Sequence, residues 1–522
     1  MRLRKKEGGQ TKLGDVWKKS FNYILVFIII LVLIALLYFG LKFGITGAAT
    51  INASNCSYSA VESAVNAAAD NDTVVIPACP SGVNWTTTLT ITKGITLQGQ
   101  GIGQTVLIDG VSKGDSNCAG AGSILTFNVN SPKTFRLTGL TIRGSAPDAF
   151  GCNKGHLIIQ GTSKSFRIDH VRFENQQTGG IRAYDDLWGV IDHNEFQGTH
   201  DQGVIVLHNT WGGVPYGDGS WADDSYFGTE KFIFIEDNTF TDPTPSGACA
   251  LDAFGGSRVV FRYNTAGCMV NHGTESSQRF RGSRVMEIYK NNFTATPGGL
   301  TNCMFNRGGT AVFWGNNCNQ NGSDSYGNSF PMINYRDTDT FSPFGSCDSS
   351  GAFDVNDATV YVSGTHNGAN ATSGVLTDTT KNFNTACSGG SCAGNEFSIR
   401  NTAKNWGSSI SSVTTTTVTN TASVYGQGRV WDNGDTYQIR KAYPCLDQVG
   451  RGKGNLISGD TPLPAAWPNQ TLEPVYQWNN TLNGVTNPVA AAAYNIHPKE
   501  NRDFNNNVAM PGYTSYTYPH PL

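Results

Sequence analysis

The sequence predicts an all-β solenoid with three strands in each coil, and three observations support this fold class. A six-residue phrase with an apolar first residue recurs at intervals of 23, 44, 26, 27 and 25 residues, as in solenoids whose repeats stack on one another. An apolar, strand-like run follows most copies. The composition, with 61 glycines and 15% charged residues, is that of a turn-rich β protein. The copies of the phrase begin at Ile168, Ile191, Ile235, Phe261, Ile288 and Phe313.

Five of the six copies carry an asparagine at their fourth position, and we expect these residues to be structural. Parallel strands lie about 4.8 Å apart, so amide side chains at the same phase of successive coils can form a hydrogen-bonded ladder. Such a ladder would hold a turn between two strands of every coil. The residues are Asn194, Asn238, Asn264, Asn291 and Asn316.

The start of the chain predicts export. Residues 1–22 are rich in Lys and Arg and should stay in the cytoplasm, whereas Tyr23–Leu41 is an apolar run. At about 1.5 Å per residue this run spans roughly 28 Å, which suits either a transmembrane anchor or a signal cut near Gly47. Either alternative places the rest outside the cytoplasm, membrane-anchored or secreted. With a net charge of −3 and no basic patch after residue 19, no nucleic-acid partner is expected.

The twelve cysteines indicate disulfides formed in an oxidising compartment. Zinc binding is the less favoured interpretation, because the sequence contains no CxxC motif. We expect Cys387 to pair with Cys392 across a short loop. Cys268 and Cys303 have nearly the same phase, which would allow a bridge between adjacent coils.

The region after the apolar run resembles a known superfamily. Residues 58–70 predict a helix that caps the solenoid, and the phrases NDTVVIPAC from Asn71 and GITLQGQG from Gly94 follow. These features resemble the pectate-lyase-like superfamily over roughly residues 56–345. The resemblance implies a right-handed parallel β-helix. It implies no single reaction, because this fold hosts lyases, hydrolases, esterases, epimerases and adhesins.

The predicted domains follow from changes in composition. The β-helix should occupy residues 50–357. Residues 358–441, rich in Thr and Ser, should form a small inserted β module. Residues 442–522, rich in Pro and Asn, should lie extended along the solenoid as a C-terminal cap.

Stacking predicts a first outward column of acidic side chains. Asp169, Asp192 and Glu236 share one phase on consecutive coils, and Arg262 follows them. Three such carboxylates could bind Ca²⁺, or two of them could serve an inverting glycoside hydrolase. The alternative is an acidic stripe whose repulsion Arg262 relieves.

The third strand of each coil predicts a second column. Aligning these strands places Asp252 on the outward face together with six residues at one phase. Two long insertions, 209–230 and 273–283, should form walls beside this face. A slip of one residue would instead turn His272 and Arg307 inward. The six aligned residues are Tyr184, His208, Phe254, His272, Arg307 and Tyr335.

If the protein is an enzyme, the family resemblance and these residues together favour β-elimination on a uronic-acid-containing polysaccharide, an acidic partner. His272 would be the base, with His208 or Asp252 beside it, and Arg307 and Arg279 would neutralise the uronate. The chain lacks the arginine motif of pectate lyases and the GHG phrase of polygalacturonases, so these roles rest on stacking. Alternatives are a membrane-anchored glycan-binding protein or adhesin, and an inverting glycoside hydrolase. The expected substrate-binding residues are Tyr184, Phe254, Arg279, Arg281, Tyr335, Trp211 and Trp221.

Overall fold

The fold is described from a computed structural model, which divides the chain into two units, Met1–Ala49 and Thr50–Leu522. In the first unit, Ile28, Ile30 and Leu31 are helical, and the predicted segment 1–22 lies outside the described residues. No helix among the described residues has both the length and the apolarity to cross a membrane. The described residues are 28, 30–31, 47–146, 152, 154–176, 179–198, 202–241, 249–267, 269–272, 281–294, 303–319, 329–333, 359–393, 397–420, 429–441, 447–453, 471–493 and 498–522.

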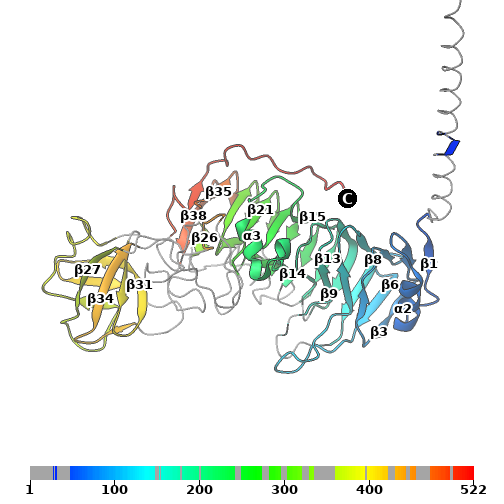
Figure 1. The fold of residues 1–522 in the computed structure, drawn as a ribbon, viewed down its shortest axis with the longest axis horizontal. Helices are drawn as coiled ribbons and strands as arrows, with labels where there is room; N and C mark the ends of the chain where they lie inside the picture. Colours follow the sequence, from blue (N-terminus) through cyan, green and yellow to red (C-terminus); the bar gives the residue numbers. More distant parts are fainter. Residues whose placement is uncertain are drawn as a thin grey trace, which may run out of the picture. The chain divides into compact units, whose positions relative to one another are not determined.

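The second unit contains coils of parallel strands stacked in register, the strand arrangement of a parallel β-helix (Figure 1). Three faces can be followed from coil to coil, and we call them the first, second and third sheets. The long strands β8 and β10 bend through the first two.

The first sheet runs in the order β1 (Thr50–Asn52), β2 (Thr73–Val75), β5 (Thr96–Gln98), β8 (Phe135–Gly144), β10 (Phe166–Glu174), β12 (Gly189–Asp192), β15 (Ile233–Glu236), β18 (Arg258–Arg262), β21 (Val285–Tyr289), β24 (Thr310–Trp314), β35 (Val475–Trp478) and β39 (Phe504–Asn506).

The second sheet contains β3 (Cys79–Trp85), β6 (Thr105–Asp109), the later halves of β8 and β10, β13 (Glu195–Gln197), β16 (Thr239–Thr241), β19 (Thr265–Ala266), β22 (Asn292–Thr294), β25 (Asn317–Asn319), β36 (Thr481–Leu482) and the antiparallel β37 (Val485–Thr486). The third sheet contains β4 (Leu89–Ile91), β7 (Leu125–Val129), β9 (Leu157–Gly161), β11 (Ile181–Ala183), β14 (Gln202–Leu207), β17 (Cys249–Phe254), β20 (Met269–His272), β23 (Met304–Asn306), β26 (Ser329–Ile333) and β38 (Val489–Ala493).

The interior is a set of side-chain stacks, which confirms the repeat read from the sequence. The apolar first residues of the six phrases pair in register and are at most 1% exposed. Phenylalanines of the second sheet stack in the same way, with ring centroids 5.0 Å apart for Phe173 and Phe196 and 4.5 Å apart for Phe196 and Phe240. Each coil therefore buries its apolar face against the next.

The predicted asparagine ladder is also confirmed. In each step the amide nitrogen of one asparagine donates to the amide oxygen of the next, as in the 3.1 Å contact from Asn264 to Asn291. The same oxygen accepts the backbone N–H of Asn264, so one side chain satisfies two donors. The ladder ends on Asn480, which donates to Phe313 O and belongs to a distant part of the sequence.

Asn480 marks a coil that the predicted boundaries did not place in the β-helix. Strands β35, β36 and β38 pair in parallel with β24, β25 and β26, and β39 continues on β35. The strands between Val475 and Asn506 thus add to the solenoid, and the residues after Asn506 form no strand. The physical reason is that coils stack when their apolar residues have the same repeat phase, whether or not the coils are continuous in sequence. A module can therefore be inserted in the sequence between two coils that are neighbours in space.

The inserted module has its own antiparallel strands and its own apolar core around Trp431 and Tyr437. Its strands are β27 (Val360–Thr365), β28 (Thr372–Ser373), β29 (Val375–Thr377), β30 (Phe397–Asn401), β31 (Trp406–Val413), β32 (Thr417–Asn420), β33 (Val430–Trp431) and β34 (Thr436–Lys441).

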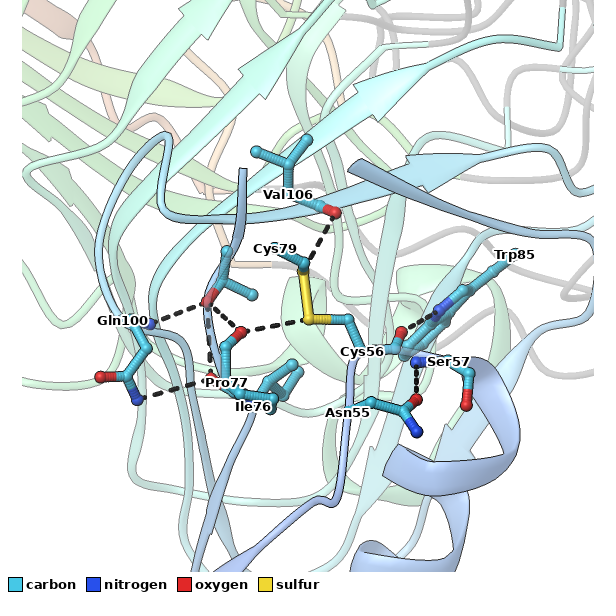
Figure 2. The surroundings of a disulfide bond; sticks show 10 residues. Asn55, Cys56, Ser57, Ile76, Pro77, Cys79, Trp85, Gln100 and Val106 are labelled. Atoms are coloured by element: carbon cyan, nitrogen blue, oxygen red, sulfur yellow. Dashed lines mark hydrogen bonds between the residues drawn. A yellow bond between two sulfur atoms is a disulfide. The ribbon is translucent and has the colours of Figure 1, made fainter. Parts of the chain in front are cut away.

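The helix α2 (Tyr58–Ala67) lies where the sequence predicts a cap. The Ser57 hydroxyl accepts from Ala60 N–H at its start, and Lys93 donates to three carbonyl oxygens at its end. A disulfide joins Cys56, just before the helix, to Cys79 of β3, and the Trp85 indole donates to Cys56 O beside it (Figure 2). The first coil is thereby tied to its cap.

Three further disulfides are present among the described residues. The expected bridge Cys387–Cys392 is confirmed. The bridge proposed between Cys268 and Cys303 is wrong, because Cys303 pairs with Cys318 and no longer has a thiol to share. The third is Cys118–Cys152. Several disulfides in one unit indicate an oxidising, extracellular or secreted environment.

Candidate functional site

The first outward column stacks in the predicted register on the first sheet. Asp169 pairs with Asp192, Asp192 with Glu236, and Glu236 with Arg262. The column continues through Tyr289, Trp314 and Trp478, and this extension to β35 could not be seen from the phrase alone.

Each acid of this column contacts an arginine. Arg136 binds both Asp169 oxygens at 2.6 Å, and Arg167 binds both Asp192 oxygens at 2.9 and 2.7 Å. Glu236 is bound by Arg262 Nε at 2.6 Å. Within the described part of the chain, no group of three or more His, Cys, Asp or Glu side chains is arranged to hold a metal ion. The acids balance their charge with guanidinium groups, and of these only Arg262, on Glu236, was named from the sequence.

Two histidines complete this arrangement. His170 Nδ1 lies 2.8 Å from Asp169 Oδ2, and His193 Nδ1 lies 2.7 Å from Asp192 Oδ2. The imidazole rings stack in parallel, with centroids 5.3 Å apart and planes 6° apart. Because the acid accepts from Nδ1, the lone pair of each neutral ring is on Nε2.

The burial of these pairs is strongly asymmetric. The Asp169 and Asp192 side chains are 0% and 4% exposed, whereas His170 and His193 are 56% and 48% exposed. No described residue hydrogen-bonds either Nε2. Buried acids therefore orient exposed bases, the relation that positions a proton-transfer group. We call Asp169, His170, Asp192 and His193, with Arg136 and Arg167, the Asp–His row.

The electrostatics of the row favour the ionised form of Asp169. Burial alone would raise the pKa of Asp169, but hydrogen bonds from Arg136, His170 and Thr138 outweigh it and hold that pKa below its ordinary value. The Arg136 guanidinium, held by the Asp169 carboxylate, has a raised pKa and stays charged. Positive charge and imidazole thus coexist on one accessible face.

The sequence reasoning did not select His170 or His193, although a signal was present. Both follow the acid of the column in the repeated tripeptide Ile-Asp-His, at residues 168–170 and 191–193. Each adopts a left-handed turn conformation, with φ of 51° and 52°, which directs the side chain outward beside the preceding carboxylate.

The second column, on the third sheet, has a different register from the one predicted. Ile181 pairs with Val204 and Leu251 with Val270, so the alignment is wrong by one residue in β14 and β20. It is wrong by two residues in β26, where Met332 pairs with Asn306. His272 consequently pairs with Ala253 and Asn306, two positions with buried side chains. A one-residue slip moves a position to the other face of a sheet.

In the observed register His208 lies one residue beyond the column of Tyr184 and Phe254, and its side chain is buried. Its Nε2 lies 2.9 Å from Leu187 O, and its Nδ1 accepts from Arg258 N–H at 3.0 Å. Burial lowers its pKa to about 4. Both nitrogens have structural partners, so we no longer propose His208 as a catalytic group. Asp252 is 6% exposed and pairs in register with Ile205.

Tyr184, Phe254 and Arg307 keep the predicted phase and are half-buried. Arg279, Tyr335 and the side chain of His272 lie outside the described residues. The structure therefore does not bring the predicted catalytic set together as one described cluster.

The insertion after β14 covers the first sheet, not the third. It folds into η1 (Trp211–Gly213), η2 (Pro215–Gly217) and α3 (Asp218–Ala222), and its Tyr226 and Phe227 pack on outward apolar residues of the first sheet. Those outward residues are Val190, Phe232, Phe234, Val260, Val285 and Tyr289.

Three of the residues predicted to bind substrate, Trp211, Trp221 and Arg281, are buried in this layer. Trp211 donates to Asp223 and lies under the Arg258 guanidinium. Trp221 donates to Gly282 O. Arg281 is 0% exposed and forms ion pairs with Asp218 at 3.1 Å and Asp447 at 3.3 Å. Apolar residues on the outer face required a cover, and the insertion supplies it.

Comparisons with known proteins place this geometry in context. No protein-family model and no curated protein matches the chain. Among solved structures it is similar to "Geobacillus virus E2 - ORF18", with 14% identity and a TM-score of 0.29 over 54% of this chain and 56% of that one. A pectin methylesterase mutant in complex with a hexasaccharide matches with 13% identity and a TM-score of 0.25, over 52% of this chain and 79% of that one.

The chain thus spans little more than half of the viral protein that it matches. With TM-scores this low, neither match identifies the activity of this chain.

Proposed function

We propose that the protein is an extracytoplasmic, polysaccharide-active β-helix protein that cleaves a uronic-acid-containing glycan by β-elimination at the Asp–His row. The observation that carries the proposal is the pair of stacked, exposed imidazoles, each oriented by a buried aspartate. The arginines beside them supply positive charge for an acidic sugar.

The chemistry needs a base, an acid and a carboxylate partner. One neutral histidine takes the C5 proton of the uronate through Nε2, and the electron pair forms the C4–C5 double bond. The C4–O4 bond breaks, and the second histidine, initially protonated, gives its proton to the leaving oxygen. The two rings exchange protonation states, so atoms and charges balance. Arg136 or Arg167 would neutralise the uronate carboxylate, which makes the C5 proton acidic.

The disulfides support an oxidising compartment, and the basic segment and apolar run of residues 1–41 support a membrane anchor or export signal. We also propose that the β-helix is right-handed, as the family resemblance implies.

A second candidate is glycan binding without cleavage. The outward column ends in two half-buried tryptophans, Trp314 and Trp478, whose parallel rings have centroids 5.9 Å apart. Aromatic faces outside a rigid scaffold are a suitable platform for sugar rings.

The first prediction separates these functions. The soluble unit, residues 50–522, is incubated with uronate polymers, and the ultraviolet absorbance of the unsaturated product is followed. We expect activity that falls by about 100-fold or more in His170→Ala and His193→Ala, because each change removes a proton-transfer group. The fold should persist, because Arg136 and Arg167 still bind the buried acids, and circular dichroism checks this.

His272→Ala is the matched control, because it tests the histidine of the third sheet. Retained activity in this variant supports the Asp–His row. If His272→Ala loses activity while His170→Ala and His193→Ala keep it, the catalytic site lies on the third sheet. New reducing ends without absorbance would indicate a hydrolase. Retention on the polymer without either product would indicate the binding protein.

A further inference from the structure

The last described segment, residues 510–522, which we call the tail, crosses the outer face of the first sheet (Figure 1). It contacts the coils in reverse order. Tyr513 donates to Glu287 on β21, and His520 N–H donates to Glu236 on β15 at 2.7 Å. Leu522 O accepts from Arg167 on β10 at 2.7 Å. The tail therefore ends within the Asp–His row.

Between these points the tail binds through carbonyl oxygens and an aromatic ring. Arg262 donates to Tyr516 O and Thr517 O, each at 2.8 Å. The Tyr518 ring stacks on Tyr263 with centroids 3.7 Å apart, and its hydroxyl donates to Asp237 at 2.7 Å.

These are the interactions that an acidic glycan would make. Arginines that donate to carbonyl oxygens would equally donate to carboxylate oxygens, the exposed face of Tyr263 would stack on a sugar ring, and Asp237 would accept from a hydroxyl. The tail follows the last strand, β39, and has no strand pairing of its own among the described residues. It can leave without breaking a sheet.

We propose that the tail is a displaceable strap over an extended binding face for acidic glycan, and that a long substrate chain replaces it. The proposal rests on the function proposed for the Asp–His row. A short oligosaccharide would bind the row through Arg136 and would displace at most Leu522 from Arg167, whereas a longer one would also need Arg262 and Tyr263. The tail then competes with long ligands, so its effect on affinity increases with the length of the glycan chain.

The test compares the full chain in detergent with the same chain lacking residues 513–522. The probes are oligogalacturonates of about three and about ten sugars, with affinities measured by calorimetry. If the strap is closed most of the time, its removal strengthens binding of the longer probe by about tenfold or more and changes that of the shorter one much less. Tyr518→Ala should shift the affinity in the same direction by a smaller factor.

Thr517→Ala is the matched control, because it keeps the carbonyl oxygen that Arg262 binds and should behave as the parent chain. Hydrogen exchange gives a second readout. The longer probe should deprotect residues 513–522 in the full chain. Equal affinities in both chains, or a tail that stays protected while the probe is bound, would overturn the strap and leave the proposed function intact. Failure of both chains to bind either probe would overturn the function and the strap together.

Discussion

At the scale of single residues, the asparagine ladder shows how a repeated side chain holds a solenoid turn. Asn291 is 2% exposed, accepts from Asn264 N–H and Nδ2, and donates to Phe261 O and Asn316. Asn292 lies next to it in sequence but is exposed. The two residues have the same chemistry and opposite surroundings.

This pair gives the second prediction. Asn291→Ala should lower the free energy of unfolding by about 2–4 kcal/mol, because it leaves several buried donors and acceptors without partners. Asn292→Ala should change it by less than about 0.5 kcal/mol, because water replaces an exposed amide. Chemical denaturation followed by circular dichroism measures both. Similar losses in the two variants would mean that the ladder is not what stabilises the turn.

At the scale of elements, the outer face of the first sheet is partly covered by segments that form none of its strands. The insertion after β14 covers one part of it, and the tail covers another. The Asp–His row lies beside this covered area, with His170 and His193 left exposed. Accessibility along one sheet is thus set by two segments that belong to no strand.

Glu287 shows the electrostatic consequence of this cover. It is completely buried, accepts from Gly228 N–H at 2.7 Å and from the Tyr513 hydroxyl of the tail, and burial raises its pKa to about 7. Those hydrogen bonds and Arg262 oppose the shift without cancelling it.

The third prediction follows from that shift. The folded protein holds the Glu287 proton more tightly than the unfolded chain, whose ordinary glutamate pKa is about 4.3. The stabilisation from this group is therefore complete below about pH 4.3 and is lost as the pH rises through about 7. Glu287→Gln should remove this dependence, a relative change on the order of 3 kcal/mol across the window.

Urea denaturation of both proteins between pH 4 and about 8 measures the effect, since other titrating groups cancel in the difference. Parallel stability curves for the parent and Glu287→Gln would contradict the assignment.

At the scale of the whole molecule, the β-helix and the inserted module have separate cores. The core of the solenoid runs from the cap of α2 to Phe504, and the module packs around Trp431. The coil interrupted by the module is still joined to its neighbour by Asn316 and Asn480, which lie 164 residues apart in sequence.

This separation gives the fourth prediction. Replacing residues 359–441 with a short Gly-Ser linker should leave the solenoid folded, because the pairing of β24 with β35 does not involve the module. The β-type circular dichroism spectrum and the denaturation midpoint should stay near those of the parent. A protein that fails to fold, while the same linker is tolerated in another exposed loop, would show that the module stabilises the last coils.

The repeat phase could be predicted because it depends on local periodicity. The apolar phrase marks a residue that must face the interior in every coil, so Asp169, Asp192 and Glu236 could be aligned on the opposite face without a structure. The asparagine ladder followed from the same phase. The position of the capping helix could also be predicted, because it depends on the helix propensity of its own residues and on its capping residues.

The third sheet could not be aligned in this way. Its strands carry apolar residues on both faces, so the pattern did not distinguish Val204 from Ile205 or Met269 from Val270, and one residue reverses the face. Contacts between segments far apart in sequence were equally invisible. Arg167 meets Leu522, Arg281 meets Asp447, and Asn316 meets Asn480 only when the coils have stacked. Local sequence periodicity determines which face a side chain takes within a coil, whereas tertiary packing decides which faces remain open, because the segments that cover them carry no repeat.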